Sequence, residues 1–99
     1  MTIIQLKYIT TLEETRNFTK AANICGVSQP TLSMQIQKLE EELKVVIFDR
    51  SKKPIKLTKI GTSLINQSKK ILKEYNRIDD ILNNKKQLLS GNFLIKSYK

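Results

Sequence analysis

Histidine and tryptophan are absent from the sequence, and its 99 residues include a single cysteine. Without histidine, neither a His-based general acid or base nor a His-ligated metal is available. One cysteine cannot form a disulfide within the chain and fits a reducing cytoplasm. Cys25 falls on the inward side of a predicted short helix, so we interpret it as a packing residue and not a nucleophile. We therefore expect no catalytic residue, no metal ligand and no cofactor, and an enzyme has almost no support.

Glycine and long apolar runs are scarce as well. The three glycines form no Gly-rich phosphate loop. No apolar run approaches the roughly 18 residues that a membrane-spanning helix needs. The first residues, MTIIQLKYITTL, lack a basic region, and Gln5 and Lys7 interrupt their apolar character, so they do not resemble a secretory signal. We expect a cytoplasmic protein without a membrane partner.

Acidic residues are few compared with basic ones. The chain has 18 Lys or Arg against nine Asp or Glu, which gives a formal net charge of +9. Such a balance favours nucleic acid or an anionic membrane surface as the partner. A hydrophobic content of 39% permits a modest core. Because a domain of this size is marginal alone, dimerisation would help to stabilise it.

The centre of the chain has the pattern of two short helices joined by a tight turn. The first follows a predicted N-cap at Asn17 and has small or apolar residues at helical spacing. Gly26 ends that pattern, and Ser28 is the predicted N-cap of a second helix with Pro30 in its first turn. The second helix carries an apolar stripe made of Leu32, Ile36, Leu39 and Leu43. Small Ala21 and Ala22 would let the helices cross closely, as in a helix-turn-helix whose second helix is free to enter a major groove.

The side of the second helix opposite its apolar stripe carries few charges in the first two turns. At 100° per residue, that side presents Pro30, Met34, Gln37, Lys38 and Glu41, flanked by Thr31 and Ser33. Carboxylates, which repel phosphates, come only in the last turns, at positions 40 to 42. The alternative interpretation is an ordinary amphipathic surface helix.

Two further elements complete the predicted body. A helix from Ile3 to about Thr15 is expected to close a three-helix core. Positions 45 to 57 read as a wing, with strands at 45–48 and 55–57 and a polar turn between them. Positions 44 to 59 hold Lys44, Arg50, Lys52, Lys53, Lys56 and Lys59 against Asp49 alone, and Asp49 and Arg50 are expected to pair at the surface. Such a hairpin is placed to reach phosphate or a minor groove, although a merely solvated loop is the alternative.

Thr58 is a predicted N-cap for a long helix from Lys59 to about Lys86. Its apolar seam of Leu64, Ile71, Tyr75, Ile78 and Leu82 has heptad-like steps. A helix about 40 Å long cannot bury such a seam against so small a body. A partner helix is the economical solution, so we expect a homodimer or a higher oligomer built from it. Binding of this lysine-rich helix to a membrane surface is a weaker alternative.

The stretch AANICGVSQPTLSMQIQKLEEELKVVIFDRSKKPIKLTKIG closely resembles the DNA-binding domain of LysR-type transcriptional regulators. VSQPTLS followed in register by IQKLEEEL, FDR and LT-x-x-G is a specific signature, and the likeness runs from about Ile3 to Ile95. Thr31 and Met34 look most like the OxyR-like, peroxide-sensing subgroup. The resemblance implies a mainly α fold: a winged helix-turn-helix with a three-helix core and a two-stranded wing, followed by a long dimerising linker helix.

The resemblance further implies a regulator that binds double-stranded DNA as a dimer at an interrupted, roughly palindromic, T/A-flanked site. Pro30, Thr31 and Met34 would touch base edges or thymine methyls. Phosphate or further base contacts would come from the other outward residues of the helix and from the wing: Ser28, Gln29, Ser33, Gln35, Lys38, Arg50, Lys52 and Lys53. No small-molecule ligand is expected within this chain.

The sequence departs from the family pattern at two places. Lys44 stands where Gly usually ends the helix in the left-handed conformation, at a cost on the order of 1 kcal/mol. Gly91, Phe93 and Ile95 match the start of an effector domain, but Lys96 stands where Gly is usual. We expect a DNA-binding domain at 1–58, a linker helix at 59–87 and a start of the missing effector domain at 88–99, frayed from about Ser90. An alternative function is to heterodimerise with a full-length regulator and block it.

Overall fold

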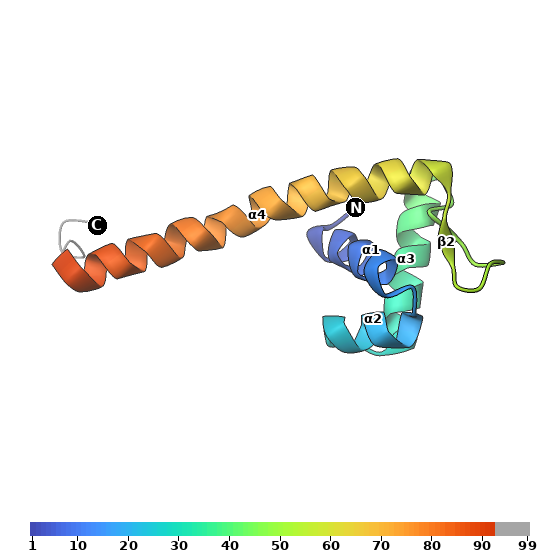
Figure 1. Ribbon diagram of the computed structural model, residues 1–99, viewed down its shortest axis with the longest axis horizontal. Helices are drawn as coiled ribbons and strands as arrows, with labels where there is room; N and C mark the ends of the chain where they lie inside the picture. Colours follow the sequence, from blue (N-terminus) through green and yellow to red (C-terminus); the bar gives the residue numbers. More distant parts are fainter. Residues whose placement is uncertain (93–99) are drawn as a thin grey trace.

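A small helical body and one long projecting helix make up the structure, a computed structural model that describes residues 1–92 and side chains through Lys85 (Figure 1). The elements in chain order are α1 (Ile3–Thr15), α2 (Phe18–Cys25), α3 (Gln29–Leu43), β1 (Phe48–Asp49), β2 (Lys56–Leu57) and α4 (Lys59–Asn92). The mainly α, winged helix-turn-helix class predicted from the sequence is confirmed.

The helix boundaries follow from side chains that satisfy free backbone N–H groups. Asn17 accepts a hydrogen bond from the N–H of Lys20 at 2.9 Å, and Ser28 accepts one from Thr31 at 3.2 Å. Thr58 does the same for Gly61 at 3.0 Å at the start of α4. All three predicted caps are thus confirmed. At the C-terminal ends of α2 and α3, Gly26 (φ 71°) and Lys44 (φ 58°) are left-handed, and the left-handed conformation considered for Lys44 is confirmed.

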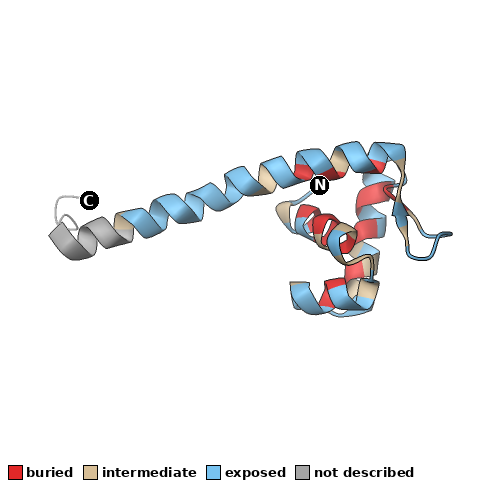
Figure 2. Cartoon of the chain, viewed as in Figure 1, coloured by how far each residue is buried: buried red, intermediate tan, exposed pale blue. Residues whose placement is uncertain are grey.

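The core lies where α1, α2 and α3 cross. Ala21 and Ala22 are fully buried there, which agrees with the prediction that small side chains let the helices cross closely. The first turns of α4 also belong to this core, through Ile65 and the partly buried Leu64 (Figure 2). The buried apolar residues are Leu6, Tyr8, Ile9, Leu12, Ala21, Ala22, Leu32, Ile36, Leu39, Ile47, Phe48 and Ile65.

The wing is a two-stranded antiparallel ribbon in which Phe48 pairs with Leu57 and Asp49 with Lys56. Its strands are shorter than the sequence predicted, and 45–47 is not a strand. The backbone of that segment bonds elsewhere: the N–H of Val45 donates to Glu40 O at 3.1 Å, and Ile47 O accepts from Thr58 N at 2.9 Å. High β-propensity was overridden there by contacts with the ends of two helices.

Helix α4 is longer than predicted. It continues to Asn92, beyond the expected end near Lys86, so Ser90 to Asn92 are helical. No proline interrupts 81–92, and Leu, Lys and Gln are good helix formers. The expected strand start at Phe93 and Ile95 lies outside the described residues. Within the described part of the chain, no helix is long and apolar enough to cross a membrane.

Candidate nucleic-acid interface

The exposed face of α3 carries the predicted reading residues. Met34 is 51% exposed. Ser28, Gln29, Pro30, Gln37 and Lys38 are exposed, and Thr31, Ser33 and Gln35 are half-buried. The face therefore combines an apolar tip at its centre with hydroxyl and amide groups around it, and the Lys38 ammonium one turn further along. These groups suit base edges and phosphates alike.

The hydroxyls of Ser28 and Thr31 form one unit at the start of α3. Ser28 Oγ accepts from the N–H of Thr31 at 3.2 Å and donates to Thr31 Oγ1 at 2.8 Å. Because its oxygen already accepts a hydrogen bond, the Thr31 hydroxyl is left to donate outward. The N-terminal end of α3 thus presents a donor, which suits a phosphate or a base acceptor.

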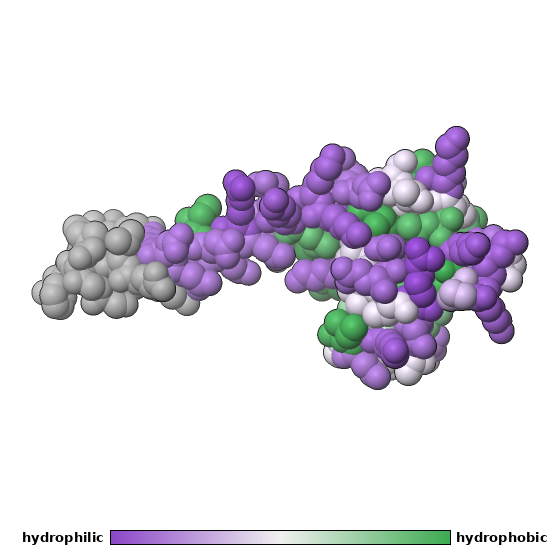
Figure 3. Space-filling model, viewed as in Figure 1, coloured by the Kyte–Doolittle hydropathy of each residue, from purple (hydrophilic) through white to green (hydrophobic). Residues whose placement is uncertain are grey.

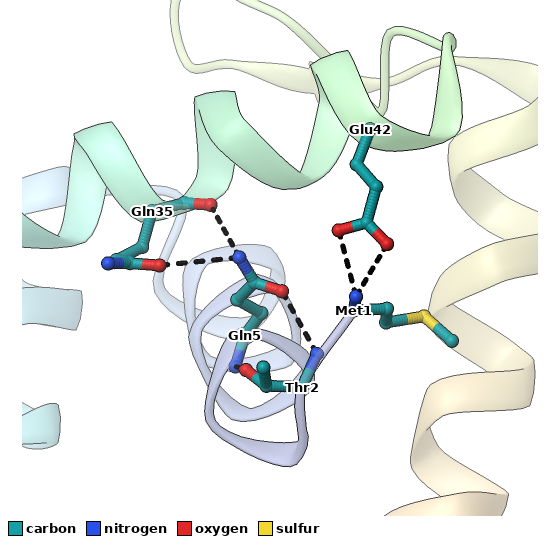
Figure 4. Close-up of polar contacts among 5 residues, drawn as sticks. All are labelled: Met1, Thr2, Gln5, Gln35 and Glu42. Carbon is teal, nitrogen blue, oxygen red and sulfur yellow. Dashed lines mark hydrogen bonds and ion pairs between the residues drawn. The ribbon is translucent and has the colours of Figure 1, made fainter.

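A glutamine pair joins α1 to the middle of α3 (Figure 4). Gln5 Nε2 lies 3.3 Å from Gln35 Oε1 and 3.5 Å from the Gln35 carbonyl, and Gln5 also completes a capping box with Thr2. Beside them, the amino group of Met1 contacts both carboxylate oxygens of Glu42, at 2.8 and 2.6 Å. Gln35 Oε1 therefore accepts a hydrogen bond within the protein, and the amide N–H groups of Gln35 can donate to an outside partner.

The tip and the root of the wing carry their cations differently. Lys52 and Lys53 are exposed at the tip. Arg50, at the root, is 3.0 Å from Glu40 Oε1 and lies over the Phe18 ring, 5.6 Å from its centroid.

The expected Asp49–Arg50 pair is wrong: Asp49 accepts instead from Ser51 N at 3.0 Å and from Ser51 Oγ. The hydrogen bond from the Ser51 hydroxyl is the main cause that lowers the pKa of Asp49 below its ordinary value.

Glu40 is a residue of this site that the sequence interpretation missed. It was grouped with the exposed carboxylates at the end of the helix, yet it is 8% exposed. Oε2 accepts from the N–H of Ile47 at 2.7 Å and of Phe48 at 3.2 Å. A weak signal was present, since position 40 lies about one turn after Ile36 and only about 40° from it around α3, at the edge of the apolar stripe. Next to Glu40 a surface depression of about 600 Å³ separates the reading face of α3 from the loop before the wing.

The predicted dimerisation residues divide into two groups along α4. Leu64 and Ile71 are partly buried against the protein's own core. The outer group is exposed in the described chain: Tyr75 43%, Ile78 56% and Leu82 48%. The neighbouring Ile81, which the prediction did not include, is 63% exposed. On the face seen in Figure 3, the projecting part of α4 is mainly hydrophilic with a small apolar cluster towards its far end. An exposed apolar stripe thus begins at Tyr75, whose ring still contacts the Lys7 ammonium of α1 at 5.5 Å, and continues beyond the body through Ile78 and Leu82.

Comparisons with known proteins agree with this geometry. A DNA-binding transcriptional dual regulator, OxyR of Escherichia coli K12, is 38% identical over 91 residues, which are 92% of this chain and 30% of that protein. The structure of full-length OxyR from Pseudomonas aeruginosa matches with a TM-score of 0.80 and 43% identity over 85% of this chain and 28% of that one. The DNA-binding domain of BenM, solved in complex with catB site 1 DNA, matches with a TM-score of 0.76 and 35% identity over 92% and 95%.

The chain therefore spans about 30% of the length of the curated regulators that it resembles. The family model for bacterial regulatory helix-turn-helix proteins of the lysR family matches residues 3–62, which include the whole of α1, α2, α3 and the wing. The caps Asn17, Ser28 and Thr58, the exposed face of α3 and the wing all lie within that match. The chain belongs to the lysR family of bacterial regulatory helix-turn-helix proteins.

Proposed function

We propose that this chain is the DNA-binding part of a cytoplasmic transcriptional regulator and carries no enzyme activity. It binds double-stranded DNA as a homodimer at an interrupted palindromic operator. The observation that carries the proposal is the exposed first half of α3, free of carboxylates and flanked by the basic wing. The BenM relative in complex with DNA, 35% identical to this chain, supports the same use of that surface.

In this proposal the residues divide their work by position. Pro30, Thr31 and Met34 contact base edges, because they occupy the first two exposed turns of α3. The helix start, through Ser28 and Gln29, and the side positions Ser33, Gln35 and Lys38 contact phosphate or neighbouring bases. Lys52 and Lys53 reach phosphate or a minor groove from the wing tip. With no Arg in the first turns of α3, nonspecific attraction and DNA shape supply much of the affinity.

The test is selection of bound duplexes from a randomised pool by the purified chain, followed by band shifts with the selected duplex and a scrambled one. The expected result is enrichment of an inverted repeat and at least about a thousandfold preference for it. Absence of any enriched sequence would contradict the proposal.

A second function, as a partner that pairs with a longer relative and blocks it, is favoured by the exposed stripe of Tyr75, Ile78, Ile81 and Leu82. It requires a heterodimer but no DNA binding by the homodimer. A chain that fails the selection, yet displaces a full-length relative from its operator, would have this function instead. The domain division at 58 and 87 remains a proposal in both cases.

A further inference from the structure

We propose that Glu40 is a positioning residue for DNA binding: it holds Arg50, and with it the wing, in register with the reading face of α3. This inference rests on the proposed function and adds one residue that the exposed surface alone does not suggest. Arg50 then acts mainly as a structural link at the root of the wing. Lys52 and Lys53, at its tip, make the phosphate contacts.

The carboxylate of Glu40 is fully engaged by the segment that leads into the wing. Oε2 accepts from the N–H groups of Ile47 and Phe48 at 2.7 and 3.2 Å, and Oε1 accepts from Arg50 Nη1 at 3.0 Å. The Glu40 side chain is only 9% exposed. One α3 side chain thus fixes both the backbone of the loop and the first cation of the wing. A buried carboxylate is tolerated only with such partners, so the arrangement is strongly coupled.

Arg50 adds a link to the first helix of the helix-turn-helix. Its guanidinium lies over the Phe18 ring in α2, 5.6 Å from the centroid, while Nη1 holds Glu40 in α3. Through Arg50 the wing is therefore connected to both helices. The same loop is joined to the start of α4, where Thr58 N donates to Ile47 O at 2.9 Å. Loss of the Glu40 charge would loosen the wing relative to α3.

The positioning role and simple electrostatics predict opposite changes in the affinity of Glu40→Gln for the selected duplex. Glu40→Gln removes a negative charge close to the proposed DNA surface and would free Arg50. If charge alone mattered, the variant would bind every duplex more tightly. If Glu40 positions the wing, Glu40→Gln binds the selected duplex about tenfold more weakly, because residues of one buried network are energetically coupled. Binding to a scrambled duplex is then unchanged or slightly tighter.

Glu41→Gln is the matched control. Glu41 is the next residue of α3, carries the same charge and lines the same depression, but it is exposed. Its substitution changes net charge by the same amount without touching the wing. We expect Glu41→Gln to leave the preference for the selected duplex unchanged and to bind both duplexes equally well or slightly more tightly. The measurement is titration of both duplexes at two salt concentrations, after circular dichroism has shown that each variant is folded.

Arg50→Met is the second variant, and it tests the inference even if Glu40→Gln does not fold. It removes the Arg50 link but leaves the hydrogen bonds from Glu40 to the backbone in place. If Glu40 and Arg50 position the wing, Arg50→Met loses affinity for the selected duplex only, and its salt slope stays within a few tenths of wild type. The double variant Glu40→Gln with Arg50→Met then loses no more affinity than Arg50→Met alone. A slope reduced by about 0.9 with equal losses on both duplexes would make Arg50 a direct phosphate contact and overturn the inference. Tighter binding of the selected duplex by Glu40→Gln, or unfolding of both variants, would also overturn it. If the wild-type chain shows no duplex preference, the proposed function itself fails.

Discussion

Gly61 and Ile47 are in such close contact that a Cβ atom on Gly61 would overlap the carbonyl oxygen of Ile47. The added atom would also lie 3.0 Å from Ile47 C and from Thr58 Oγ1. The backbone of the first turn of α4 therefore packs directly against the backbone of the loop before the wing. This explains physically why LT-x-x-G carries a glycine at its last position: only hydrogen fits there.

Gly61→Ala should destabilise the protein by about 2 kcal/mol, because neither the Ile47 backbone nor the Thr58 cap can move away cheaply. This sign is opposite to that expected for an ordinary helix position, where Ala is more stable than Gly by about 1 kcal/mol. Ser63→Ala, at an exposed position two residues later, is the control and should be close to neutral. Urea denaturation followed by circular dichroism checks both. A stabilised Gly61→Ala would show that the close approach is absent.

Lys44→Gly should stabilise the protein by about 1 kcal/mol, since Gly adopts the left-handed conformation without steric cost. Lys44 has φ 58°. Arg16→Gly is an informative comparison, because Arg16 is also left-handed, with φ 53°, but its side chain donates to Glu13 O at 2.8 Å and to Ile55 O at 2.9 Å. The gain in backbone energy should there be offset by lost hydrogen bonds. Equal gains at both positions, measured by urea titration, would contradict this reasoning.

Local rules predicted the helices well because their signals are local. Asn17, Ser28 and Thr58 cap their helices by hydrogen bonds to residues only three positions later. The stripe of Leu32, Ile36 and Leu39 correctly indicated which side of α3 is buried. The exposed face of α3 could then be predicted as the side opposite this stripe. Such features depend on spacing that is visible in the sequence.

The wing root could not be predicted in the same way. Whether Arg50 pairs with Asp49 or with Glu40 depends on how the loop folds back on α3, which no local pattern records. The strand predicted at 45–48 was too long for the same reason. Glu40 and Thr58 form hydrogen bonds with the backbone groups that a longer strand would have used. The α4 seam was likewise divided by tertiary packing: Leu64 and Ile71 contact the core, whereas Ile78 does not.

The exposed stripe on α4 predicts the assembly. Replacing Ile78 and Ile81 by Asp should give monomers by sedimentation velocity, because two charges cannot be buried in an apolar helix pair. Both residues are more than half exposed in the single chain, at 56% and 63%, so the monomer should stay folded. Asn76→Asp with Asn83→Asp is the control, with the same added charge on the opposite side of α4. An unchanged mass for the Ile variant would exclude this stripe as the dimer contact.

The wing-tip lysines should act without regard to DNA sequence. Lys52→Ala or Lys53→Ala should weaken the selected and the scrambled duplex equally and reduce the salt slope by about 0.9 for each lost phosphate contact. Lys73→Ala, an exposed lysine on α4, removes the same charge away from the wing and should leave the slope nearly unchanged. A changed sequence preference with an intact slope would mean that the wing reads bases.

Met34 should carry direct readout. It lies at the centre of the exposed face of α3, is 51% exposed and bears no charge. Its methyl-bearing tip suits a thymine methyl group in the major groove. Thr31 shares this role, but its hydroxyl also belongs to the Ser28 cap at 2.8 Å, so Thr31→Ala would disturb the helix start as well. Met34→Ala is therefore the cleaner variant.

Met34→Ala should cost about 1 kcal/mol on the selected duplex, since a mismatched base pair costs about 1 to 3 kcal/mol. On scrambled DNA the cost should be near zero, and the salt slope should not change because no phosphate contact is lost. Gln37→Ala, on the same face but nearly one turn further along α3, should cost less, because the helix leaves the groove towards its acidic end. Titration of both variants against both duplexes at two salt concentrations measures these differences. Equal losses for Met34→Ala on the two duplexes would show that α3 only positions the domain, and that specificity comes from the shape of the DNA.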